Sequence, residues 1–231
     1  MRRATSRSCS RSLCSAALSL ALTLAGAARA DLGWDVLYEQ DGVTVSEWPV
    51  RGRDLPDFRG EVELEADVFD VLAVIIDVPA QTQWMWQCRE SRVLAVESDS
   101  AKHVYQVLDL YWPAADRDVV LRSEVQVLGS RELAVRFVSR DDPAAPPVPD
   151  LVRMPHLAGE FLLGARDATH TSVTYTVSAD PGGSLPALVV RRTVRDSPFQ
   201  TLVGLRRRVT ETRGAYRDVA EHWRSRASLA R

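Results

Sequence analysis

Most of the chain between positions 43 and 177 alternates apolar and polar residues with a period of two, which is typical of β-strands with one face exposed to water. The clearest runs begin at Val43 after an Asp41-Gly42 turn and continue at 62–66, 132–137 and 172–177. Further strands are expected at 93–96, 104–110, 119–128 and 160–163, which gives about eight or nine. They follow one another too closely for helical crossovers, so we expect one curved antiparallel sheet.

Two segments instead carry apolar residues at helical spacing. The first covers 67–76, with Asp67 as a plausible N-cap and Pro79 beyond its end, although its β-branched residues leave a buried strand as the alternative. The second runs from 185 to about 211, which is roughly 40 Å of helix at 1.5 Å per residue. Pro198 lies within it and is expected to kink it. The sequence therefore predicts an α+β fold with a long C-terminal helix.

Arg117 stands on the inward face of one expected strand. Counting by two from this arginine, the same face carries mostly valine and leucine up to position 127. A guanidinium stays charged, so it needs a carboxylate, a carbonyl or a polar ligand headgroup there, and a purely structural pairing is equally compatible. Asp116 and Asp118 alternate to the other face. We therefore expect a distant acid, such as Asp109 or Glu160, as the partner.

The first thirty residues predict a secretory signal peptide, with early arginines, an apolar run at 16–25 and Ala28-Arg29-Ala30 before Asp31. The run is too short to span a bilayer of about 30 Å comfortably. Cleavage near Ala30 would leave an exported, periplasmic or secreted protein with 24 basic and 31 acidic residues, a net charge of −7. Such a charge argues against nucleic-acid binding. Only Cys88 remains after cleavage, as a buried apolar group or, alternatively, a reactive thiol.

A series of short motifs then gives the chain a family resemblance. They are Trp84-Met85, 90–94, Trp112-Pro113 with 116–118, Pro155-His156 with 159–161, Thr174-Tyr175 leading into 180–186, and Pro198 with 201–202 and 205–206. In this order, over residues 34–212, they resemble the START (steroidogenic acute regulatory protein-related lipid-transfer) family. With its N-terminal segment, the chain looks like an exported bacterial member. The resemblance implies a helix-grip (START/Bet v 1-like) fold over 31–212, a curved antiparallel sheet wrapped around the C-terminal helix, and a helical tail at 213–231.

The resemblance also implies one apolar tunnel, with Arg117 as a polar anchor in it or as part of a structural ion pair near it. A tunnel of about 300 to 1,000 Å³ would suit a lipid tail, because each buried methylene contributes about 0.8 kcal/mol. The alternative is a sheet filled by its own side chains. The wall candidates, for which plain core packing is the alternative, are Trp84, Met85, Tyr105, Phe137, Phe161 and Tyr175 from outside the long helix, and Leu188, Val194, Leu202 and Leu205 from it.

We therefore expect a monomeric, non-catalytic protein that binds a lipid or sterol-like molecule for transfer or sensing, without cofactor or metal. The alternative is a helix-grip enzyme of the polyketide cyclase type, although the four histidines are scattered and no catalytic motif occurs. A sensing module that contacts a protein through 215–231 is a third candidate. Gly182-Gly183 before the long helix is either a hinge or an ordinary turn. Arginines at 191–195 and 206–208 form a basic stripe for transient membrane contact or a solvated helix face.

Overall fold

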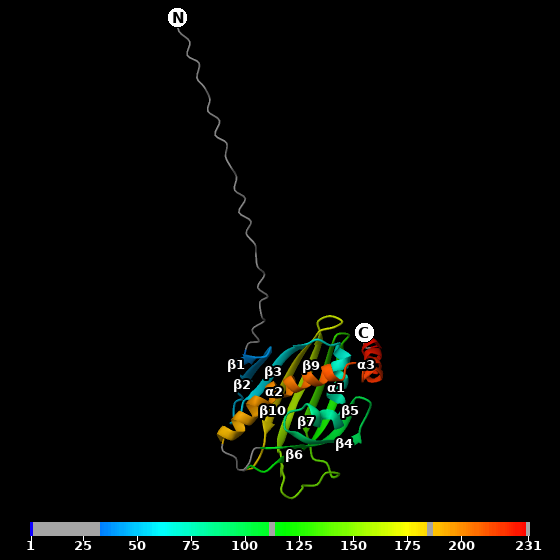
Figure 1. The fold of residues 1–231 in the computed structure, drawn as a ribbon. Helices are drawn as coiled ribbons and strands as arrows, with labels where there is room; N and C mark the ends of the chain where they lie inside the picture. Colours follow the sequence, from blue (N-terminus) through cyan, green and yellow to red (C-terminus); the bar gives the residue numbers. More distant parts are fainter. Residues whose placement is uncertain (2–32, 111–113, 184–186, 230–231) are drawn as a thin grey trace. The chain divides into compact units, whose positions relative to one another are not determined.

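The alternating segments form a single ten-stranded sheet, in the order β1-β2-β3-β10-β9-β7-β6-β5-β4, with β8 beside β6 (Figure 1). The computed structural model describes Met1 and residues 33–110, 114–183 and 187–229, without the side chains of 187–190 and 192, so the expected signal peptide lies outside the described residues except for Met1. The strands are β1 Asp35–Gln40, β2 Val43–Trp48, β3 Asp57–Leu64, β4 Cys88–Val96, β5 Ala101–Leu108, β6 Arg117–Gly129, β7 Glu132–Ser139, β8 Val152–Arg153, β9 His156–Ala165 and β10 Thr171–Asp180.

Pairing along this sheet is antiparallel throughout, apart from the short parallel contact of β6 with β8. The curved antiparallel sheet is therefore confirmed, whereas β1 and β8 were not expected. The Asp41-Gly42 turn joins β1 to β2 with both residues at positive φ, 50° and 70°. This conformation matches the twist of a tight hairpin.

Three α-helices and a short 3₁₀ helix complete the part of the chain that the structure describes. Helix α1 (Val68–Ile76) begins where expected, since the Asp67 carboxylate accepts a hydrogen bond of 2.9 Å from the Phe69 N–H. The 3₁₀ helix η1 (Pro79–Gln83) follows it. Helix α2 (Ala187–Glu211) contains Pro198 and lies against β2, β3 and β10, and α3 (Arg217–Leu229) packs against α1. The helix-grip fold is thus confirmed (Figure 1).

Two glycines allow α2 to come close to the rest of the protein. A Cβ at Gly60 of β3 would lie 2.7 Å from Cδ1 of Leu202, and a Cβ at Gly204 would lie only 2.0 Å from the Trp84 carbonyl oxygen. Leu202 and Leu205 are fully buried at this contact. The position of α2 therefore depends on glycine at these two positions, because a Cβ atom at either one would clash.

The C-terminal tail packs more closely against the rest of the protein than the sequence indicated. In α3, Trp223, Ala220 and Ala227 are buried in the main core, so the expected tail is part of the same compact unit, Gly33–Arg231. The segment 141–150 between β7 and β8 places Ala145 in a small cluster on the other face of the sheet. Among the described residues, no helix is long and apolar enough to cross a membrane.

Candidate functional site

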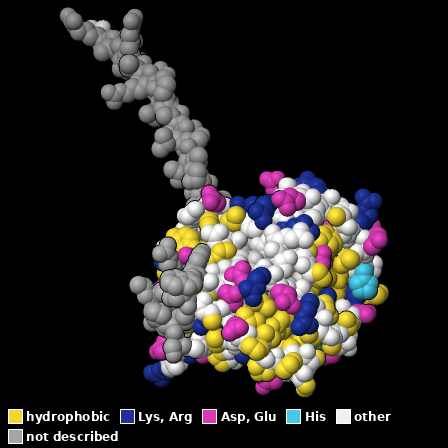
Figure 2. Space-filling model, turned by 60° about the horizontal axis from the view of Figure 1, so that its bottom comes forward, with side chains coloured by type: hydrophobic (Ala, Val, Ile, Leu, Met, Phe, Trp, Pro, Cys, Tyr) yellow, Lys and Arg dark blue, Asp and Glu magenta, His cyan; other side chains and the backbone are white. Residues whose placement is uncertain are grey.

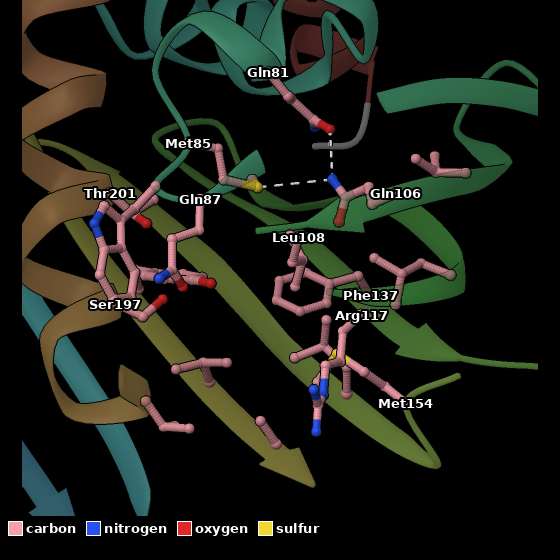
Figure 3. A pocket seen from close by; sticks show the side chains of 18 of the residues that line it. Gln81, Met85, Gln87, Gln106, Leu108, Arg117, Phe137, Met154, Ser197 and Thr201 are labelled. Atoms are coloured by element: carbon pink, nitrogen blue, oxygen red, sulfur yellow. Dashed lines mark hydrogen bonds between the residues drawn. The ribbon is translucent and has the colours of Figure 1, made fainter. Parts of the chain in front are cut away.

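A cavity of about 120 Å³ lies between the sheet, helix α2 and the turn after η1 (Figure 3). Its wall is mainly apolar because the inward-facing positions of β5, β6, β7, β9 and β10 all point at it. The apolar lining includes Met85, Val104, Leu108, Leu121, Val135, Phe137, Met154, Leu157, Phe161, Tyr175, Val177, Ala179 and Val194. The volume is below the expected 300 to 1,000 Å³, because large side chains fill much of the interior.

Three aromatic rings form one side of the cavity. Phe161 of β9 and Tyr175 of β10 are paired across the two strands, and their rings stack with centroids 4.3 Å apart and an interplanar angle of 12°. Phe137 of β7 lies 6.4 Å from both rings, over Gly159, where a Cβ would be 2.7 Å from the Phe137 ring. Burial raises the pKa of the Tyr175 hydroxyl, so this group stays neutral.

Arg117 lines the cavity, as expected from its inward face, but its contacts differ from the prediction. Its guanidinium donates to the carbonyl oxygens of Pro181 at 3.1 Å and Gly182 at 2.9 Å, and to that of Ala115. Burial lowers the pKa of Arg117, and the negative charge of Asp116 opposes this shift. Arg117 thus fastens the segment between β10 and α2 to the start of β6.

The two acids proposed as partners of Arg117 bind other arginines. Asp109 lies 3.2 Å from Arg89, and Glu160 lies 3.0 Å from Arg136. The prediction of a carboxylate partner was wrong because backbone carbonyls, which a sequence pattern does not reveal, satisfy the guanidinium. Gly182 is at φ +62° and Gly183 at φ +70°, so this turn requires conformations that favour glycine.

Away from Arg117, the cavity wall contains a pair of glutamines. The Gln106 amide of β5 donates to the Gln81 side-chain oxygen at 2.8 Å and approaches the Met85 sulfur at 3.6 Å (Figure 3). Ser91 donates to the same Gln81 oxygen at 2.7 Å, and the Gln81 amide donates to the Ile75 carbonyl at 3.1 Å. These buried amides fix one another's orientation, and sequence reasoning missed them because glutamine is usually exposed.

Helix α2 faces the cavity with hydroxyl groups. Thr193, Ser197 and Thr201, spaced four residues apart, line it together with Val194. Leu202 and Leu205 are not among the lining residues but pack in the core, so the prediction that they face the tunnel was wrong. The side chain of Leu188 lies outside the described residues. The spacing of the three hydroxyls was the missed signal, since i, i+4 and i+8 share one helix face.

Trp84 and Tyr105 were also expected in the wall but are not among its lining residues. Trp84 packs in the core with its ring edge-on to Phe161, at 6.2 Å between centroids. Tyr105 lies on the opposite face of the sheet, where its hydroxyl donates to Asp118 at 3.1 Å, and Asp118 also pairs with Arg153 at 2.8 Å. Burial, together with Asp118, raises the pKa of Tyr105 to about 12. Of the candidates, Arg117, Met85, Phe137, Phe161, Tyr175 and Val194 line the same cavity.

The lining offers little for acid–base chemistry. No histidine or carboxylate is among its described residues. His103 binds Asp142 at 2.9 Å, and His156 lies 3.0 Å from the Ser178 hydroxyl. Within the described part of the chain, no three of His, Cys, Asp and Glu are arranged to hold a metal ion. What the arrangement offers is an apolar space with a few hydrogen-bonding groups and one cationic side chain, Arg117.

These features define a class: a small α+β protein in which a sheet grips a helix around an internal apolar cavity. The family model of the START domain matches residues 19–213, and the chain belongs to this family. It is 33% identical over 173 residues to the uncharacterized protein PA1579 of Pseudomonas aeruginosa, a match that covers 75% of this chain and 85% of that protein. The function of this protein is therefore considered as that of a START domain.

Solved structures agree with this assignment. The crystal structure of a STAR-related lipid transfer protein from Xanthomonas axonopodis is 34% identical, with a TM-score of 0.71, and the match covers 77% of this chain and 99% of that one. Human STARD10, at 22% identity and a TM-score of 0.73 over 82% of this chain and 78% of that one, shows the same fold. The ZhuI aromatase/cyclase of Streptomyces sp. R1128 shares the fold more distantly. Its sequence identity is 14% and its TM-score is 0.52, and the match covers 69% of this chain and 96% of that one.

Proposed function

We propose that this protein binds one hydrophobic ligand, a lipid or sterol-like molecule, in the cavity and serves in lipid transfer or sensing without catalysis. The observation that carries the proposal is the apolar cavity itself, closed on one side by three aromatic rings, with Arg117 as the single charged residue among its described lining. Burial of apolar surface gives such a site its affinity. The START fold supports this class of ligand.

The cavity volume sets how much of a ligand fits without movement. An apolar cavity of about 150 Å³ accommodates benzene, so 120 Å³ corresponds to a short section of hydrocarbon. A complete lipid therefore requires the wall to move outward. Because α2 is held by its close contacts at Gly60 and Gly204 and by the Arg117 hydrogen bonds beside its start, binding includes a rearrangement around this helix.

An enzyme of the cyclase type is less well supported. General acid–base catalysis needs a titratable side chain within hydrogen-bond reach of the substrate. The described lining supplies only Arg117, which remains protonated, and Tyr175, whose pKa is raised by burial. The similarity to ZhuI is a similarity of fold.

We further propose that the protein is an exported bacterial member that acts as a monomer and touches membranes only transiently. The signal-peptide pattern at 1–30 supports export. Arginines of α2 with described side chains are engaged within the fold: Arg191 pairs with Glu47 at 3.0 Å, and Arg206 donates to the Asp41 carbonyl at 2.8 Å. On the face shown in Figure 2, acidic, basic and apolar side chains are mixed. These contacts favour a weak membrane interaction.

Native mass spectrometry of the protein isolated from its own cells, followed by solvent extraction, tests the proposal. The expected result is a bound hydrophobic molecule that is released on denaturation. A ligand-free protein that also takes up nothing from phospholipid vesicles would contradict it.

A further inference from the structure

Thr201 places a buried hydroxyl group in the cavity wall without a hydrogen-bond partner. The residue is 1% exposed, it lines the cavity, and its Oγ1 makes no hydrogen bond within the described part of the chain (Figure 3). A threonine in a helix usually returns its hydroxyl to the carbonyl four residues earlier. Thr210 and Thr212 of the same chain do so, at 3.0 and 2.8 Å. Thr201 does not.

An unpaired buried hydroxyl costs stability, and valine would fill the same space without that cost. Three polar side chains of the cavity are already paired. Gln81 and Gln106 bind each other. Arg117 is held by three backbone carbonyls. Among the buried side-chain polar atoms of the described lining, the Thr201 hydroxyl oxygen is the one without a partner, so its hydrogen-bonding capacity is left for a ligand.

The chemistry of this group restricts the ligand. A hydroxyl both donates and accepts, so it pairs with either a hydroxyl or a carbonyl oxygen. No carboxylate is among the described lining residues, and the only cation is Arg117. An uncharged oxygen is therefore the atom that suits Thr201 best.

We propose that Thr201 binds an oxygen atom of the ligand, and that the ligand is a neutral amphiphile with a hydroxyl or carbonyl group inside the cavity, not a plain hydrocarbon chain. This inference rests on the proposed function, since it names the chemical class that the same cavity selects. Ser197 and Thr193, one and two turns before Thr201 on the same helix face, extend the polar side of the wall along the ligand.

The test compares the full-length protein with its Thr201→Val variant. Binding is followed by displacement of the neutral fluorophore N-phenyl-1-naphthylamine with 1-decanol, methyl nonanoate and 1-chlorodecane. The first is a hydroxyl probe, the second an ester carbonyl and the third an apolar reference. For Thr201→Val, we expect at least one of the two oxygenated probes, 1-decanol or methyl nonanoate, to bind about tenfold more weakly than to wild type. Binding of 1-chlorodecane is expected to be unchanged.

Stability gives an independent readout, with matched controls. Thr201→Val is expected to raise the melting temperature of the ligand-free protein, because it removes an unpaired buried hydroxyl. Thr171→Val is expected to lower it, because the buried Thr171 hydroxyl donates to the Ala66 carbonyl at 2.8 Å. Thr201→Ser keeps the hydroxyl and is expected to keep the preference for the oxygenated probe.

The outcomes separate the two proposals. If all three probes bind equally well to wild type and Thr201→Val, or are weakened equally, the oxygen contact is refuted while the cavity remains a binding site. A Thr201→Val protein that melts below wild type would also refute it, since the hydroxyl would then have a partner in the fold. If neither the fluorophore nor any probe binds wild type, the proposed function itself fails.

Discussion

A larger side chain that fills the cavity shows separately what the empty cavity contributes to ligand binding and what it costs in stability. Ala179 of β10 lines the cavity, and Ala179→Leu adds three carbon atoms there. An engineered leucine-to-alanine change leaves a cavity of about 150 Å³, so the reverse change brings enough volume to occupy the 120 Å³ present. At about 24 cal/mol per Å³ of cavity, complete filling would raise the free energy of unfolding by up to about 3 kcal/mol.

The matched control is Ala134→Leu on β7. Ala134 is fully buried but is not among the cavity-lining residues, so the same added volume overpacks the core and lowers the free energy of unfolding by about 1–3 kcal/mol. Urea unfolding measures both variants, and uptake of N-phenyl-1-naphthylamine measures ligand binding. Ala179→Leu is expected to be more stable than wild type and to lose uptake. A variant that is destabilised as much as Ala134→Leu, or that retains full uptake, would refute the reasoning.

Three further predictions concern the surroundings of the cavity. Arg117→Met leaves three carbonyls without their donor and should lower the free energy of unfolding by at least about 2 kcal/mol in urea; unchanged stability would show that these hydrogen bonds do not fasten the segment. Cys88, whose pKa burial raises to about 12, should react with Ellman's reagent at pH 8 about 1,000-fold more slowly in the folded than in the unfolded protein, and equal rates would contradict this. Hydrogen bonds to the Thr169 backbone and to His170 hold the pKa of Asp167 at about 2, below 3.8, and Asp167 raises the pKa of His170 above 6.5. Asp167 therefore contributes stability that is lost as pH falls toward 2, and His170 contributes stability that is lost as pH rises above its folded pKa. The stability difference between wild type and Asp167→Asn should be largest between about pH 4 and 6.5, and a pH-independent difference would contradict it.

The sheet could be predicted because most strands expose one face to solvent and so alternate apolar and polar residues. The first helix could be predicted from its N-cap residue. Alternation located β3, β7 and β10, and the Asp67 cap located the start of α1. β8 has only two residues, which is too short for a pattern. The position of α3 could not be predicted, because Trp223 and two alanines suffice to bury its inner side.

The site was harder to predict, because apolar residues both fill the core and line the cavity. Apolar character alone therefore does not distinguish the two locations. In β5, both faces are covered, so Tyr105 and Gln106 could not be assigned by alternation; the aromatic residue faces outward and the amide faces the cavity. In α2, Leu202 and Leu205 dock the helix on the sheet. The smaller Ser197 and Thr201 leave the space beside them open.

The partners of Arg117 show a second limit. Its inward direction followed from the period of the strand, whereas its partners are carbonyls of Ala115, Pro181 and Gly182, which come from two separate segments. Only the path of the backbone determines such contacts. Gly182 and Gly183, interpreted from the sequence as either a hinge or an ordinary turn, both lie at positive φ, a conformation that suits either interpretation.

Photo-crosslinking tests most directly whether the ligand occupies the space between the sheet and α2. The protein would be loaded with a dodecanol that carries a diazirine near its chain end, irradiated and digested, and the adducts assigned by tandem mass spectrometry. The account predicts adducts on the cavity-facing residues of β7, β9 and α2, with Phe137, Phe161 and Val194 among them. Adducts confined to Tyr105 and its neighbours on the outer face, or to exposed positions such as Val36 and Val96, would contradict it.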